Sequence, residues 1–237
     1  ERVGFTGEAR FGLVNVRHRL DKAALPRMVD RFAQLAETPG TPLSRPAPRP
    51  RLVSTSGQQA ATLLKLGLPR PEKLVVFCPG AEYGPAKRWP ERHFARLARE
   101  LTRMGVTVWL VGSSKDGPAD GNSADGDFAA AANSNLYRNL CGKTNMAEAI
   151  DLIALAQLVV CNDSGLMHVA AALARPLIAL FGSSSPNFTP PLSDTAEILH
   201  LDLACSPCFR RACPLGHTDC LQKLEPARVL EHARAYL

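Results

Sequence analysis

A strand, a polar turn and a helix in direct succession constrain the fold of this chain most. Residues 158–160 are apolar and mostly β-branched, as expected of a buried parallel strand. Residues 169–174 are rich in alanine and leucine, which favours a helix. The residues between, 161–168, read CNDSGLMH and carry helix-capping side chains and one glycine. The pattern predicts a strand that enters a helix through a tight turn.

Such a turn is suited to anions, because the first N–H groups of a helix lack intrahelical partners and the helix dipole is positive there. Phosphate is the anion we expect. Asp163 adds a carboxylate that can accept hydrogen bonds from sugar hydroxyls, and His168 lies about one turn inside the helix. The alternative is an ordinary helix cap followed by a core histidine, and these residues alone leave both interpretations open.

Strands and helices alternate along residues 51–237, which predicts an α/β fold with a doubly wound parallel sheet. Ligands of such sheets bind outside the carboxyl ends of the strands, and four loops of small residues follow four of the predicted strands. These loops are residues 79–81, 112–115, 162–165 and 182–185. The strands are expected at 74–78, 106–111, 158–161 and 177–181, with an edge strand at 197–201. The helices are expected at 58–66, 92–104, 127–133, 146–155, 165–174 and 226–237.

The first 50 residues differ in character. Residues 25–36 predict an amphipathic helix with Pro26 in its first turn and an apolar face that includes Val29 and Phe32. Prolines are dense from 39 to 50 and predict a stiff linker. We therefore expect one domain to end within residues 1–50 and a second to span residues 51–237. Because the chain does not begin with Met, we expect a fragment or a trimmed chain.

Composition narrows the function classes. The formal charge of +6 suits an anionic substrate or an acidic membrane surface. With 6% aromatic residues and no basic run interleaved with aromatics, nucleic acid is not expected as a partner. The longest apolar stretch is too short to span a bilayer. Three of the seven cysteines, Cys78, Cys141 and Cys161, fall in or beside predicted core segments, which favours the reducing cytosol.

A second polar motif follows the strand at 74–78. Residues 78–90 read CPGAEYGPAKRWP and form a rigid loop that carries Gly80 and the adjacent cations Lys87 and Arg88. Lys87 is placed to offer a point charge to a diphosphate. The alternative is a solvated lysine–arginine pair on the surface.

Two patterns bear on metals. The D-x-D of residues 125–127 occurs in a polar, glycine-rich loop and is interpreted as a solvated turn. A cysteine segment near the C-terminus opens with ligand spacing that its second half does not repeat, so zinc, free thiols and disulfides all remain open. Its members are Cys205, Cys208, Cys213 and Cys220, with His217 among them. We expect the segment to order the connection to the terminal helix and to leave the donor site unaffected. No metal or cofactor is expected at the donor site.

Residues 78–90, 162–174, 182–191 and 4–8 resemble the donor-site motifs of the ADP-heptose:lipopolysaccharide heptosyltransferase II family, in glycosyltransferase family 9. The resemblance implies an inverting glycosyltransferase of the GT-B type, with two Rossmann-like domains. It implies transfer of L-glycero-D-manno-heptose from ADP-heptose to the first heptose of the lipopolysaccharide inner core. The implied partners are ADP-heptose and a lipid A-core acceptor, and the implied location is cytoplasmic and peripheral at the inner face of the inner membrane.

Carried over to this sequence, the resemblance assigns Lys87 to the donor diphosphate and Asp163 to the heptose hydroxyls. The implied donor-binding set is Gly80, Lys87, Asp163, Ser164, Gly165, Leu166 and His168. The family's proposed aspartate base belongs to the N-terminal acceptor domain, so the catalytic residue stays unassigned. We expect residues 1–50 to be the end of that domain, and these 237 residues alone to bind donor without transferring sugar. The alternatives are a GT-B transferase for another nucleotide sugar and a non-catalytic nucleotide-binding module.

Overall fold

The computed structural model describes residues 1–7, 9–10, 12–44, 47–117 and 134–237. The chain divides into two compact units. Unit 1 comprises Glu1–Arg49 with Ser185–Pro190, and unit 2 comprises Pro50–Ser184 with Pro191–Leu237. The predicted D-x-D turn, the predicted helix at 127–133 and Glu8 of the 4–8 motif lie outside the described residues.

Unit 2 is built on a six-stranded sheet in the order β5-β4-β3-β6-β7-β8, with every neighbouring pair parallel. The strands are β3 (Leu74–Cys78), β4 (Thr107–Leu110), β5 (Tyr137–Asn139), β6 (Leu158–Asn162), β7 (Leu177–Leu180) and β8 (Ala196–Leu199). The chain starts at β3, runs outward to β5 and then returns to β6 on the other side of β3. This reversal is the switch point where ligands of doubly wound sheets bind, and it lies between the loops that follow β3 and β6. The predicted fold class is confirmed.

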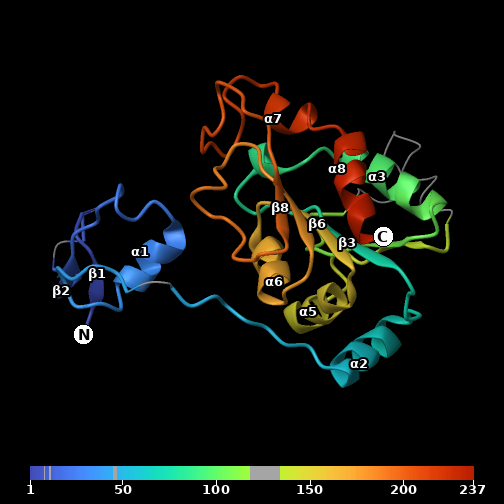
Figure 1. The fold of residues 1–237 in the computed structure, drawn as a ribbon, viewed down its shortest axis with the longest axis horizontal. Coiled ribbons are helices and arrows are strands. Elements are labelled where there is room, and N and C mark those ends of the chain that lie inside the picture. The colour runs from blue at the N-terminus through green and yellow to red at the C-terminus, as the bar shows by residue number, and fades with distance from the viewer. Residues whose placement is uncertain (8, 11, 45–46, 118–133) are drawn as a thin grey trace. The chain divides into compact units, whose positions relative to one another are not determined.

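Helices cover both faces of this sheet because successive strand residues point to opposite sides (Figure 1). Val75 and Phe77 pack with helices α3 and α8, whereas Leu74 and Val76 pack with α2, α5 and α6. The helices of unit 2 are α2 (Ser56–Leu66), α3 (Glu91–Arg103), α5 (Met146–Leu155), α6 (Gly165–Ala172), α7 (Asp219–Gln222) and α8 (Pro226–Ala233). Short 3₁₀ helices lie at η1 (Pro85–Lys87) and η2 (Arg234–Tyr236). None of the described helices is long and apolar enough to cross a membrane.

Unit 1 contains the parallel pair β1 (Val3–Phe5) and β2 (Val16–His18), followed by helix α1 (Met28–Gln34). The predicted helix at 25–36 is too long. Pro26 lies before the helix, whose N-cap is Arg27. The chain turns tightly just ahead of it, because the Leu25 amide donates to the Asp21 carbonyl at 3.0 Å.

The predicted apolar face of α1 is wrong at Phe32, whereas Leu25 is buried and Val29 is half-buried. Asp30 is 1% exposed and Gln34 is buried, whereas Phe32 is 67% exposed. Burial of Asp30 is tolerated because two nitrogens of the Arg27 guanidinium donate to its two oxygens, at 2.9 and 3.0 Å. Gln34 is satisfied by the Thr41 carbonyl at 2.9 Å. Local ion pairing therefore overrides the apolar periodicity here.

Unit 1 includes Ser185–Pro190, although the sequence predicts that these residues belong to the domain of residues 51–237. The Met28 amide donates to the Phe188 carbonyl at 2.9 Å, and the Arg31 guanidinium lies 4.9 Å from the centre of the Phe188 ring. These contacts tie the segment to α1.

Candidate functional site

The start of α6 lies at the switch point. Asn162 ends β6, and three residues later the chain enters the helix at Gly165. Ser164 is the extended N-cap, and in the described part of the chain its side chain makes no capping hydrogen bond. The first-turn amides of α6 are therefore left without a side-chain cap, as an anion site requires.

A cavity of about 410 Å³ opens beside this helix start, at the carboxyl ends of β3, β4 and β6. Four of the predicted donor-binding residues line it, namely Gly80, Ser164, Gly165 and Leu166. The remaining lining residues are Ala81, Glu82, Val111, Gly112, Ser113, Asp116, Thr144, Asn145, Met146, Ala149 and Val169. The volume suits a nucleoside-sized ligand.

Lys87 and Asp163 are brought together next to the start of α6. The Lys87 Nζ atom lies 2.5 Å from Asp163 Oδ2, which also accepts a hydrogen bond from the Ser184 hydroxyl at 2.5 Å. The Lys87 side chain is 16% exposed and Asp163 is buried. Lys87 is therefore not the solvated surface cation of the alternative interpretation. Three residues far apart in sequence therefore meet at the Asp163 carboxylate: Lys87 from η1, Asp163 itself after β6, and Ser184 after β7.

His168 is the last member of the predicted set. His168 is exposed on α6, but desolvation by the protein atoms around its ring lowers the pKa of its imidazole, Asp163 raises it and Lys87 lowers it, with a net shift below the ordinary value of 6.5. The imidazole is therefore neutral at pH 7. A negatively charged group bound beside it would raise that pKa.

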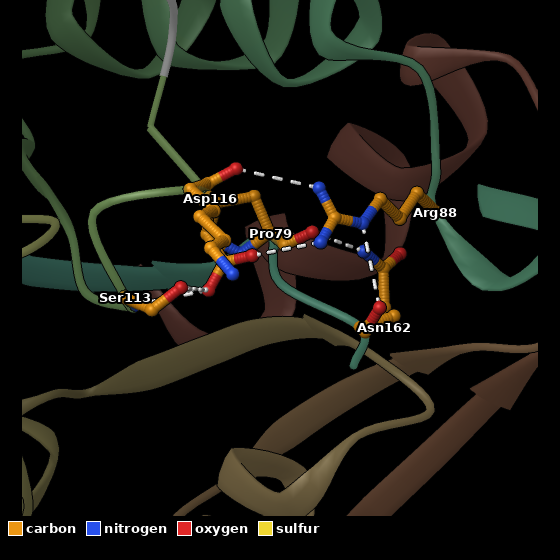
Figure 2. Close-up of polar contacts among 7 residues, drawn as sticks. Pro79, Arg88, Ser113, Asp116 and Asn162 are labelled. Atoms are coloured by element: carbon orange, nitrogen blue, oxygen red, sulfur yellow. Dashed lines mark hydrogen bonds and ion pairs between the residues drawn. The ribbon is translucent and has the colours of Figure 1, made fainter. Parts of the chain in front are cut away.

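Asp116 is a residue of this region that sequence reasoning missed. Its carboxylate accepts hydrogen bonds from the Ser113 amide at 2.9 Å and hydroxyl at 2.6 Å, and it pairs with Arg88 Nη2 at 3.1 Å (Figure 2). A Cβ at Gly80 would lie 2.5 Å from Asp116 Oδ2, so only glycine fits there. The 112–115 loop was recognised from its small residues, but nothing local distinguished the aspartate that follows it.

The cysteine segment is not remote from this site. The Tyr83 hydroxyl donates to the Phe209 carbonyl at 2.8 Å, and the Ala86 amide donates to the Arg211 carbonyl at 3.1 Å. A Cβ on Gly84 would lie 2.4 Å from that same carbonyl oxygen. The segment therefore packs against the loop that carries Lys87. The segment contacts more than the connection to the terminal helix, and the expectation that it leaves the donor site unaffected stays a prediction.

All seven cysteines are free thiols. The four in the C-terminal segment share a small cavity with His217, Ala86 and Ser183. Among the residues that the structure describes, no three histidine, cysteine or acidic side chains are arranged to hold a metal ion. Backbone hydrogen bonds, the first of them from Thr218, lower the pKa of the Cys213 thiol.

Comparison with known proteins decides the family. The family described as Glycosyltransferase family 9 (heptosyltransferase) matches residues 1–219. The chain belongs to glycosyltransferase family 9. The resemblance inferred from its motifs is thereby confirmed, and membership in this family makes the chain a sugar transferase.

Two relatives in this family bear the name lipopolysaccharide heptosyltransferase 2. Those of Salmonella typhimurium and Escherichia coli are each 42% identical over 244 residues, covering 100% of this chain and 69% of the relative. The structure of E. coli ADP-heptose LPS heptosyltransferase II matches with a TM-score of 0.84 at 41% identity, over 100% of this chain and 69% of that one. The E. coli heptosyltransferase WaaC with ADP matches with a TM-score of 0.59 at 21% identity, over 94% of this chain and 60% of that one. That second likeness concerns the fold alone.

Proposed function

We propose that this family 9 protein transfers a heptose from ADP-heptose to the first heptose of the lipopolysaccharide inner core. Its similarity, over the whole of this chain and 69% of each relative, to two proteins named lipopolysaccharide heptosyltransferase 2 supports this choice of reaction. Residues 51–237 hold the donor in this proposal, and residues 1–50 belong to the acceptor side.

The Lys87–Asp163 pair at the start of α6 is the observation that carries the proposal. A diphosphate bound at the first-turn amides lies near the Lys87 ammonium and competes with the Asp163 carboxylate for it. The diphosphate can therefore replace Asp163 as the partner of Lys87. Asp163 is thereby released to accept hydrogen bonds from the sugar hydroxyls, and neutral His168 lies within its electrostatic reach. Ser164, Gly165 and Leu166 supply the helix start, while Gly80 leaves bare backbone opposite.

The reaction is a direct displacement. An acceptor hydroxyl attacks the anomeric carbon, the bond from that carbon to the diphosphate oxygen breaks, and a base takes the hydroxyl proton. The configuration at the anomeric carbon is inverted. The negative charge that develops on ADP is stabilised by Lys87 and by the positive end of α6. The donor-binding residues do not include the base that takes the proton of the acceptor hydroxyl.

The acceptor is a lipid A-core molecule presented at the cytoplasmic face of the inner membrane. The formal charge of +6 suits peripheral binding to an acidic lipid surface. Sedimentation with vesicles of phosphatidylglycerol and phosphatidylethanolamine tests this. We expect the protein to sediment with vesicles that contain phosphatidylglycerol and to stay in solution with vesicles that lack it.

Calorimetry with ADP, UDP and GDP tests the donor. ADP is expected to bind most tightly, and to bind equally well in EDTA because the proposed site uses cationic protein groups. A preference for UDP or GDP would favour a transferase for another nucleotide sugar. Binding lost in EDTA and restored by Mg²⁺ would contradict the proposed chemistry.

A heptose-transfer assay separates catalysis from binding. A protein in which these 237 residues are joined to a complete acceptor domain is expected to release ADP when given ADP-heptose and a heptose-bearing acceptor. Tight ADP binding without release of ADP by that protein would favour the non-catalytic module.

A further inference from the structure

Asn162 uses both ends of its side-chain amide on one loop. Its Nδ2 donates to the Pro79 carbonyl at 2.6 Å, and its Oδ1 accepts from the Trp89 amide at 3.0 Å. Pro79 directly follows β3, and Trp89 lies just before α3, so the two contacts fall at the two ends of the loop 79–89. Asn162 is fully buried at the end of β6, beside Pro79 (Figure 2).

The next residue along the chain, Asp163, pairs with Lys87, which lies two residues before Trp89 in the same loop. Asn162 therefore holds both ends of the loop, and Asp163 pairs with the loop's charged side chain, that of Lys87. The loop contributes little regular structure of its own, since its only helix is the three-residue η1. The far end of the loop is fixed independently, because the buried Trp89 indole donates to the Leu224 carbonyl at 2.8 Å.

The pairing is specific to an amide of this length. An aspartate at 162 lacks the donor to Pro79 and places a charge against that carbonyl oxygen, in a position with no exposure to water. An apolar side chain leaves both the Trp89 amide and the Pro79 carbonyl without this partner. A residue that served only the strand would not need a donor and an acceptor aimed at the two ends of a loop.

We propose that Asn162 is a positioning residue for the donor site, which sets the span of loop 79–89 so that the Lys87 ammonium reaches the start of α6. The inference rests on the proposed role of Lys87 as the cation that meets the donor diphosphate. Asn162 itself touches no donor in this account and acts through Lys87.

A double-mutant cycle with calorimetry of ADP separates this role from a purely structural one. Asn162→Asp is expected to weaken ADP binding about tenfold in the wild-type background, and less than about twofold when Lys87→Ala is already present. Val160→Ala is the matched control, because Val160 is also fully buried on β6 but packs in the core. It is expected to lower the melting temperature and leave ADP affinity within about twofold.

Asn162→Ser is the second variant, for the case that the aspartate variant does not fold, since serine keeps a polar group without a charge. A lower melting temperature with unchanged ADP affinity in a folded Asn162 variant would overturn the positioning role. So would a loss of affinity that persists at full size in the Lys87→Ala background. If Lys87→Ala itself leaves ADP affinity unchanged, the proposed donor site fails, which is a separate and distinguishable outcome.

Discussion

Helices α5 and α6 both begin at the same cavity, but their first turns are satisfied in different ways. At α5, Asn145 Oδ1 accepts from the Glu148 amide and Glu148 Oε2 accepts from the Asn145 amide, each at 2.9 Å. This capping box closes the helix start with the chain's own groups. At α6 the Ser164 side chain makes no such bond within the described residues. A helix start that already holds a carboxylate serves the fold, whereas one that lacks it is open to a ligand's anion.

The lysines beside α5 and α6 differ in the same way as the two helix starts. Lys65 pairs with Glu148 and ties α2 to α5, where Asp151 also accepts from the Ser54 and Thr62 hydroxyls at 2.7 Å. Lys87 pairs with Asp163 just before α6. Lys65 neutralises a carboxylate that caps its helix, whereas Lys87 neutralises a carboxylate that is no part of a cap, and we expect a bound diphosphate to compete for it.

The largest expected effect comes from removing the cation at α6. Lys87→Ala should weaken ADP binding by about 1.5–3 kcal/mol, roughly 10- to 150-fold, the worth of a charge-assisted hydrogen bond. Lys65→Ala removes the corresponding cation at α5 and is the matched control, with ADP affinity expected to stay unchanged. Calorimetry measures both. Equal affinities for wild type and Lys87→Ala would refute the assignment of Lys87.

A methyl group at the first position of α6 should separate stability from binding. A Cβ on Gly165 meets no atom within 4 Å and its φ is not positive, so Gly165→Ala should stabilise the fold by up to about 0.5 kcal/mol. The same methyl group occupies the space in front of the helix start. ADP binding should therefore weaken about tenfold, the equivalent of roughly 1.4 kcal/mol. Unchanged ADP affinity, measured beside a thermal melt, would place the diphosphate elsewhere.

Breaking the cap of α5 should have the opposite outcome. Asn145→Ala removes one half of the capping box and should lower the free energy of unfolding by about 1 kcal/mol. Affinity for inorganic pyrophosphate should stay within about twofold, because the α5 amides are not expected to bind phosphate. Urea unfolding and calorimetry with pyrophosphate measure the two quantities. A stable variant that no longer binds pyrophosphate would reverse the roles of the two helices.

The smallest expected effect is a pH dependence that distinguishes the helices. The folded state holds the pKa of His168 below its ordinary 6.5, so the unfolded chain takes up the proton first. Its contribution to stability is complete above pH 6.5 and declines as the pH falls below that value. The Lys65 ammonium and the Asn145 amide lower the pKa of Glu148 from 4.5, so α5 loses stability only at more acidic pH.

Between pH 7.5 and 5.5, therefore, His168→Gln should lose less stability than wild type. His93, whose pKa burial also lowers, is common to both proteins and does not affect the difference. Chemical unfolding at several pH values measures it. Identical slopes for the two proteins would show that His168 does not titrate as assigned.

Helix α5 and the buried strands could be predicted from the sequence, because they depend on local patterns of apolar residues. The apolar periodicity of residues 146–155 predicted α5 with its observed bounds, and the buried strands followed from their β-branched runs. Strand β5 was missed because it is short, with only Tyr137 of its three residues buried. Phe32 was assigned wrongly to the buried face of α1, where Asp30 is buried in an ion pair with Arg27.

The contacts that build the site could not be predicted from local sequence. The sequence placed Lys87 and Asp163 at the same sheet edge, but their contact depends on β3 pairing directly with β6, where Cys78 is aligned with Cys161. Asn162 was read as part of a turn, although a polar amide that ends a fully buried strand must find buried partners. The packing of the cysteine segment against the Lys87 loop joins residues more than 100 positions apart in sequence.

Amide chemical shifts during a titration with inorganic pyrophosphate test the central claim most directly, because this probe carries the diphosphate without base or sugar. We expect saturable shifts of the Gly165 and Leu166 amides at the start of α6, and none at Met146 and Ala147 at the start of α5. Saturable shifts confined to α5, or saturable binding that leaves the α6 amides unmoved, would contradict it.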